Sequence, residues 1–135
     1  MILNGIEKKT DKIDAEFIIR KNSSSTHITI TSKEGLSITL TFNDKNYDPR
    51  NIKINETIDL NKHIFWDVTL LDIKTYYLFD ISKDKVLLTR LEDNLFRVEV
   101  DINDPDMIYT PSKDKNEFKS LQIEETFKFN YEDKK

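Results

Sequence analysis

The sequence predicts an all-β fold, either a single antiparallel β-sandwich of jelly-roll type or a closed β-barrel, with roughly nine to ten strands and little or no helix. Two observations favour this class. Apolar and polar side chains alternate with period two along most of the chain, and short turn sequences separate the alternating segments. The length of 135 residues suits one domain, which we expect to span residues 1–135.

Residues 10–20 permit two interpretations. Thr10 could cap a short helix, because apolar residues follow at a spacing of four. The same segment also alternates as a strand over 15–20, which would pair with 26–31 through a turn. We favour the strand.

Two clear strands follow, joined by a tight turn. Ile28 and Ile30 alternate with polar residues, and the pattern continues over 36–42. The segment between them ends in Gly35, which can adopt the positive φ that a hairpin turn requires. We therefore expect an antiparallel hairpin here.

A second hairpin is predicted from strands 64–71 and 76–81. A tight turn between them sets Leu70 opposite Tyr77, and on the other face it sets Asp67 opposite Asp80. Like charges in that position repel. Three resolutions are open: a lysine or a metal ion offsets the charges, one carboxyl titrates high, or the register is slipped by one residue.

The C-terminal third contains two more alternating segments. Residues 96–102 place four apolar side chains on one face and charged side chains, including Glu99 and Asp101, on the other. Over 121–131 the apolar residues again share one parity. The polar segment 111–117 is the best candidate for a long loop.

The composition excludes several kinds of chemistry. Cysteine is absent, which excludes disulfides, thiol nucleophiles and thiolate metal sites. The two glycines, Gly5 and Gly35, cannot form a glycine-rich phosphate loop. His27 and His63, the only histidines, fall on polar strand positions, where solvated side chains are expected. We therefore expect no cofactor and no catalytic site.

One segment partly matches a calcium-binding loop. Asp44, Asn46 and Asp48 have the spacing of the first three ligands of a helix-loop-helix calcium site. The sixth position of the motif, however, is Pro49, where glycine is needed. Ordinary turns that use aspartate and asparagine side chains explain the segment, so we expect no metal site.

Sequence signals for export and for membrane insertion are missing. Residues 1–9 lack the apolar stretch of a signal peptide. No apolar run approaches the ~18 residues that a membrane span needs. We expect a cytoplasmic protein that does not associate with membranes.

The charge is concentrated in one part of the chain. The whole chain carries −4, whereas residues 92–106 alone carry −5. This segment contains six acidic residues, namely Glu92, Asp93, Glu99, Asp101, Asp104 and Asp106. Such a field repels nucleic acid and suits a basic protein partner. Glu99 and Asp101 lie ~7 Å apart on one strand face, which also fits a pair of acid–base carboxylates, although a solvated face explains them better.

Aromatic and apolar residues fall on both faces of the second predicted hairpin. Phe65, Tyr76 and Leu78 lie on the parity opposite Tyr77 and Phe79. Either other strands cover both faces, or Phe65, Tyr76 and Leu78 form an exposed contact surface. The first interpretation is favoured, because tyrosine and phenylalanine fill protein cores readily.

These observations favour a non-catalytic protein-binding module, an acidic inhibitor or immunity-type protein that docks a basic partner. One alternative is a domain that binds a carbohydrate or a small apolar ligand through a sandwich face or a barrel interior. Trp66, Tyr76 and Tyr77 would then form the binding surface. A further alternative is a structural subunit of a phage or surface assembly, whose strands join edge to edge.

Overall fold

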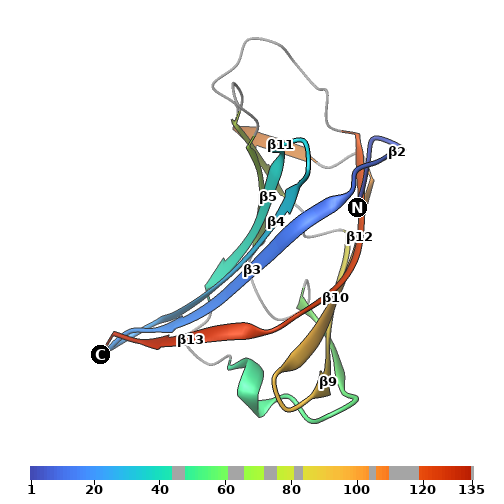
Figure 1. Ribbon diagram of the computed structural model, residues 1–135. Helices are drawn as coiled ribbons and strands as arrows, with labels where there is room; N and C mark the ends of the chain where they lie inside the picture. The colour runs from blue at the N-terminus through green and yellow to red at the C-terminus, as the bar shows by residue number, and fades with distance from the viewer. Residues whose placement is uncertain are drawn as a thin grey trace.

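The computed structural model shows two β-sheets packed against each other (Figure 1). It describes residues 1–43, 48–60, 66–71, 76–80, 84–103, 106–109 and 119–134. For residues 42–43, 66–71, 76–80 and 106–109 it describes the backbone alone.

Sheet A contains six strands. In spatial order they are β2 (Ile6–Glu7), β1 (Ile2–Leu3), β12 (Ser120–Phe127), β10 (Leu95–Asn103), β9 (Lys85–Glu92) and β6 (Thr57–Asp59). All neighbouring strands in sheet A run antiparallel. The sheet therefore joins the N-terminal residues to strands from the last third of the chain.

Sheet B contains seven strands. In spatial order they are β11 (Asp106–Tyr109), β8 (Tyr76–Asp80), β7 (Trp66–Leu71), β5 (Ser37–Asn43), β4 (Ser24–Ser32), β3 (Thr10–Ile19) and β13 (Phe129–Asp133). The five strands from β3 to β8 form a meander, because each pairs with the next described strand of this sheet along the chain.

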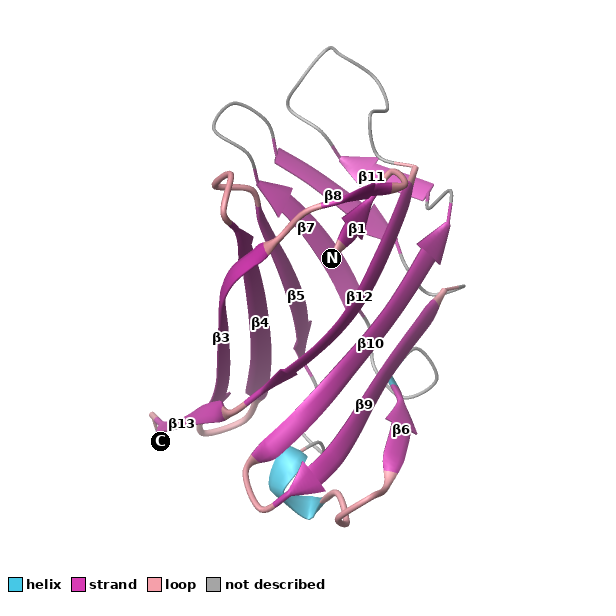
Figure 2. Ribbon diagram, turned by 45° about the vertical axis from the view of Figure 1, so that its right-hand side comes forward, coloured by secondary structure: helices cyan, strands magenta, loops and turns pink. Residues whose placement is uncertain are grey.

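The predicted fold class is confirmed. Of its two forms, the two-sheet sandwich is correct, because the sheets do not close into a barrel (Figure 2). Ten of the described strands are four residues or longer. Thr10–Ile19 is a strand, which excludes the alternative helix. A short 3-10 helix covers Pro49–Asn51, and no helix in the described part of the chain is long and apolar enough to cross a lipid bilayer.

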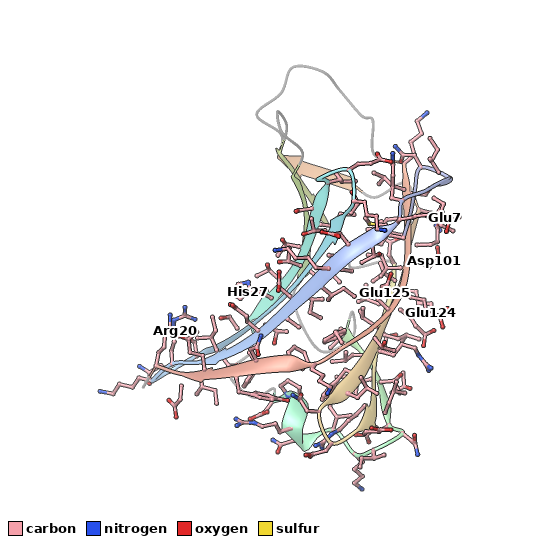
Figure 3. All side chains as sticks on the ribbon, in the orientation of Figure 1. Glu7, Arg20, His27, Asp101, Glu124 and Glu125 are labelled. Carbon is pink, nitrogen blue, oxygen red and sulfur yellow. The ribbon has the colours of Figure 1, made fainter. Side chains whose placement is uncertain are left out.

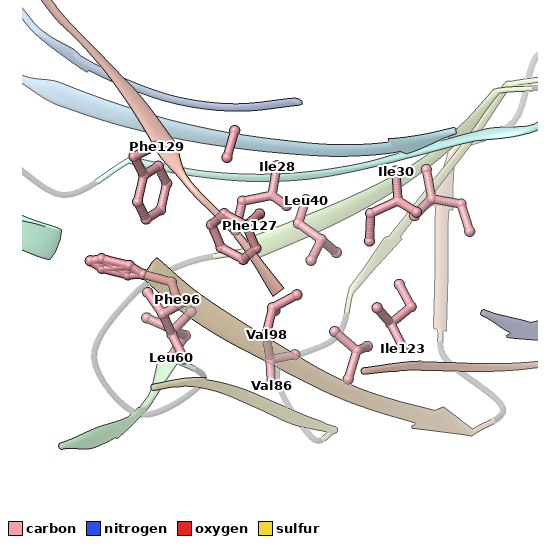
Figure 4. Close-up of a cluster of buried hydrophobic side chains, with 14 of the residues drawn as sticks. Ile28, Ile30, Leu40, Leu60, Val86, Phe96, Val98, Ile123, Phe127 and Phe129 are labelled. Atoms are coloured by element: carbon pink, nitrogen blue, oxygen red, sulfur yellow. The ribbon is translucent and has the colours of Figure 1, made fainter. Parts of the chain in front are cut away.

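The core lies between the sheets and follows the alternation in the sequence (Figure 4). Sheet B contributes Ile28, Ile30 and Leu40, each fully buried. Sheet A contributes alternate residues of its longest strands, including Phe96 and Val98. The inward-facing side chains of both sheets form one contiguous cluster, as expected for a sandwich.

One segment belongs to both sheets. β12 lies in sheet A, and after Lys128 the chain continues as β13 at the edge of sheet B. β13 runs parallel to β3, with Phe129 opposite Ala15. The expectation of a purely antiparallel fold was therefore incomplete. The single residue between β12 and β13 leaves no room for a reversal, so the chain keeps its direction as it enters the second sheet.

The predicted register of the second hairpin is confirmed at the backbone. Leu70 is the partner of Tyr77, and Asp67 is the partner of Asp80. A slipped register is thereby excluded. β11 extends the row, since Asp106 is the partner of Asp80 on its other side.

The tight turn before β5 also follows the prediction. Gly35 has a φ of +87°, and its amide donates to the carbonyl of Ser32. The hydroxyl of Ser32 accepts hydrogen bonds from the amides of Glu34 and Leu36. A residue with a Cβ atom would be strained at position 35 because of the positive φ.

Arginine side chains close one end of the sandwich, next to the 3-10 helix. The Arg90 guanidinium donates to the carbonyls of Arg50 (2.9 Å), Ile52 (2.7 Å) and Asp93 (2.7 Å). It also lies 5.9 Å from the centroid of the Phe96 ring. Arg90 therefore ties the 48–52 segment to the turn between β9 and β10.

Arg50 lies over the neighbouring rings. Its guanidinium carbon is 4.9 Å from the Tyr131 ring centroid and 5.9 Å from that of Phe17. Burial disfavours the ionised form of Asp48, but hydrogen bonds from Arg50 and its positive charge outweigh that effect and lower the pKa of Asp48. The pair forms a charged lid over the aromatic end of the core.

Candidate functional site

A concave groove of about 500 Å³ lies on the outer face of sheet A. Its lining residues come from β9, β10, β12 and the N-terminal strands, and they are Met1, Ile2, Glu7, Lys85, Glu99, Val100, Asp101, Gln122, Ile123 and Glu124. Figure 3 shows Glu7, Asp101 and Glu124 on the side of sheet A that faces away from sheet B. We call this feature the acidic groove.

One row of residues crosses the acidic groove from strand to strand. Asp101 on β10 has Lys85 of β9 on one side and Gln122 of β12 on the other. Ile2 of β1 follows Gln122, and Glu7 of β2 follows Ile2. Because direct cross-strand partners share one face, five strands contribute neighbouring side chains to the same surface.

A second row places two carboxylates directly opposite each other. Glu99 on β10 is the backbone partner of Glu124 on β12. Arg97, on the same face of β10, donates from Nε to Oε1 of Glu99 over 3.0 Å. In the described part of the chain, Glu124 has no basic side chain within ion-pairing distance. The like-charge pair is thus only half compensated, at a cost to stability.

Neighbouring amides orient the carboxylate of Asp101. Gln122 Nε2 donates to Oδ1 over 3.2 Å, and Asn103 Nδ2 donates to the same oxygen over 3.1 Å. The other oxygen, Oδ2, accepts no hydrogen bond from the described residues. The carboxylate is therefore held in place while one oxygen stays available to a donor from outside.

The groove is strongly negative and partly apolar. Its side chains include four carboxylates and one ammonium group, a balance of −3. Ile2 is 40% exposed at the rim, and Met1 lines the groove beside it. Carboxylates beside exposed aliphatic side chains suit a partner that is both basic and apolar.

The structure brings together only part of the predicted acidic patch. Glu99 and Asp101 lie in the acidic groove. Glu92 and Asp93 lie at the turn between β9 and β10, at the far end of the same sheet, where Asp93 contacts Arg90. Asp106 lies away from the groove.

Asp106 belongs to sheet B, because the chain crosses to β11 after β10 ends at Asn103. Asp104 lies outside the described residues. The acidic residues that are close in sequence are thus separated where the chain passes from sheet A to sheet B. The alternation of polar and apolar residues does not predict where that change of sheet occurs.

The predicted aromatic surface falls largely outside the described side chains. Phe65 is not described, and for Tyr76 and Leu78 only the backbone of β8 is described. Leu78 is the partner of Thr69, and Tyr76 is the partner of Leu71. Tyr76 and Leu78 therefore alternate along β8 with Tyr77 and Phe79, whose backbone partners are Leu70 and Val68.

The sequence interpretation missed half of the acidic groove. The missed residues belong to other strands than β10, namely Glu7 on β2, Lys85 at the start of β9, and Gln122 and Glu124 on β12. Gln122 and Glu124 alternate with strongly apolar residues, so the sequence could have predicted that they face solvent. It could not have predicted that they lie beside Glu99 and Asp101, because that depends on a non-local strand pairing.

His27 lies on the outer face of sheet B, away from the groove. Its Nδ1 is 3.3 Å from Oγ1 of Thr41. Burial lowers its pKa below the ordinary 6.5, and the nearby charge of Glu16 opposes this effect while Arg20 adds to it. His63 lies outside the described residues, and the described part of the chain contains no cluster of His, Cys, Asp and Glu suited to hold a metal ion.

No protein-family model, no curated protein and no solved structure matches the chain. The function of the acidic groove is therefore inferred from its own geometry and charge.

Proposed function

We propose that the chain is a non-catalytic protein-binding domain that docks a basic partner protein through the acidic groove of sheet A. The observation that carries this proposal is the convergence of four carboxylates from three strands on one concave surface. A half-compensated pair, Glu99 opposite Glu124, costs stability, and a positively charged partner would remove that cost.

The charge of the groove also favours one class of partner. A surface of −3 repels phosphate backbones, which argues against nucleic acid. It attracts cationic proteins over several ångströms and so accelerates their encounter. The exposed Ile2 supplies apolar area at the groove, from which an interface gains much of its binding energy.

Neutralising the groove tests the proposal. A partner is first captured from native lysate at low ionic strength, and its association is then measured by surface plasmon resonance. The variant combines Glu7→Gln, Glu99→Gln, Asp101→Asn and Glu124→Gln. We expect its association rate at low salt to fall by about tenfold or more, because steering is lost.

A matched control carries the same change in charge elsewhere. Asp11→Asn, Asp14→Asn, Glu16→Gln and Glu132→Gln neutralise four exposed acids on β3 and β13 of sheet B. The control is expected to change the association rate by less than about twofold. Equal rates for the groove variant and the wild type would contradict the proposal.

A further inference from the structure

We propose that the acidic groove takes one arginine side chain of the partner as its anchor, with aliphatic neighbours of that arginine packed on Met1 and Ile2. This inference rests on the proposed function and names the chemistry of the group that enters the site. It follows from the acceptor geometry, the apolar walls and the position of the one lysine.

The acceptors match a planar guanidinium. Glu99 and Glu124 are direct cross-strand partners, with Cβ atoms ~5 Å apart. Asp101 lies two residues from Glu99 on the same strand face, ~7 Å away. Three carboxylates therefore surround one small area from two strands, as a forked group with five donors requires.

Two of these carboxylates are already oriented and keep an acceptor available. Arg97 holds Glu99 through Oε1, while Gln122 and Asn103 hold Asp101 through Oδ1. The second oxygen of each accepts no hydrogen bond from the described residues. Fixed acceptors lower the entropic cost of binding, so the site is prepared for charged hydrogen bonds from outside.

The walls suit the aliphatic part of an arginine. Met1 and Ile2 line the groove beside the carboxylates, whereas Val100 and Ile123 direct their side chains into the core and contribute only backbone to its floor. The volume of about 500 Å³ is ample for one long side chain. Arginine buries its methylene groups against such walls while its head group reaches the acceptors.

Lys85 determines which end of the groove accepts the cation. It is the partner of Asp101 on the β9 side, so a second positive group is repelled there. The rim formed by Ile2 lies on the opposite side, beyond Gln122. A partner segment with one arginine between aliphatic residues fits this arrangement better than a polylysine stretch.

A second copy of this chain does not fit as the occupant. The whole chain carries −4 and the groove carries −3, so two grooves repel each other.

Arginine is favoured over lysine because its planar fork binds carboxylates through two hydrogen bonds, whereas an ammonium acts as a point charge.

Three short peptides test the anchor: acetyl-Ile-Arg-Ile-amide, the same peptide with lysine, and the same peptide with citrulline, which is neutral and nearly isosteric with arginine. Each is titrated into the full chain and followed by amide chemical shifts. We expect the arginine peptide to shift the amides of Ile2, Asp101 and Gln122, with the lysine peptide at least about threefold weaker and the citrulline peptide without effect.

Conservative variants assign the effect to the groove. Glu99→Gln and Asp101→Asn are each expected to weaken the arginine peptide by about tenfold, whereas Glu92→Gln at the β9–β10 turn leaves it unchanged. Well-dispersed amide spectra verify that each variant is folded.

The outcomes separate the two proposals. Equal binding of the arginine and lysine peptides, or chemical-shift changes outside the groove, would overturn the arginine anchor. The docking function would still stand if binding of a captured basic partner depended on the groove carboxylates. If the variant with the neutralised groove still binds both the arginine peptide and the partner, both proposals are overturned.

Discussion

The hydroxyl of Thr10 on β3 donates to Oε1 of Glu125 on β12 over 2.7 Å, and this bond connects the two sheets. Glu125 occupies an inward position of β12, between the buried Ile123 and Phe127. Both partners are half-buried. A charged group at this position is tolerated because it has a partner on the opposite sheet.

Removing the hydroxyl leaves the carboxylate without that partner. Thr10→Val preserves the size and β-branching of the side chain, and we expect it to lower the free energy of unfolding by about 1.5 kcal/mol, the value of a hydrogen bond to a charged group. Urea denaturation measures the change. Thr126→Val, on the outer face of β12, is the control and should have little effect. A Thr10→Val protein as stable as the wild type would show that the bond contributes nothing.

Arg90 is expected to be essential to the end of the sandwich. Its side chain is only 14% exposed and donates to four backbone carbonyls, which lysine cannot all reach. Arg90→Lys should lower the free energy of unfolding by about 2 kcal/mol, because several backbone carbonyls, including the half-buried one of Ile52, lose a charged donor. Arg97→Lys affects one surface ion pair and should cost under about 0.5 kcal/mol. Equal losses in the two variants, measured by chemical denaturation, would contradict this role.

The opposed carboxylates of the acidic groove predict a conflict between stability and binding. Glu124→Gln removes one like charge from the pair with Glu99. We expect the free energy of unfolding to rise by about 0.3 kcal/mol at low salt. The gain is small because Glu124 is exposed and solvent screens its charge. The gain should vanish in about 0.5 M salt, and partner association should slow. Asp11→Asn controls for the change in net charge, and a loss of stability in Glu124→Gln would refute the interpretation.

His27 predicts a dependence of stability on pH. Burial lowers its pKa in the folded chain below 6.5, so the unfolded chain binds more protons between the two pKa values. Stability is therefore fully present above pH 6.5 and falls as the pH drops through 6.5 toward the folded pKa. His27→Gln should lack this component.

The difference between the two unfolding curves, measured from about pH 8 to about pH 5.5, isolates His27, because the other titrating groups are common to both proteins. Parallel curves over that interval would show that burial does not shift this histidine.

Local patterns made much of the fold predictable. The hairpin with Asp67 opposite Asp80 follows from alternation and one short turn, so its register was derivable. β9 was missed because Leu87 and Leu91 interrupt its alternation with Val86 and Leu88. A strand with apolar residues on both parities has no clear period.

The candidate site was only half predictable. Glu99 and Asp101 stand out because they lie on the polar parity of a strong strand. Their partner Glu124 is found only when β12 is placed beside β10, and Glu7 only when β1 is placed beside β12. Such pairings between distant segments depend on tertiary packing, which no short window of sequence contains.

The segment shared by both sheets has a consequence for the newborn protein. Ile2 pairs with Gln122, and Ala15 pairs with Phe129. The first strands of the chain therefore gain these partners only after the last strands have been synthesised. Until residues 120–133 have emerged from the ribosome, the edge of β3 that pairs with β13 and the edge of β10 that pairs with β12 have no neighbouring strand. Such distant pairings form slowly, and during that interval a chaperone would protect the nascent chain from joining another.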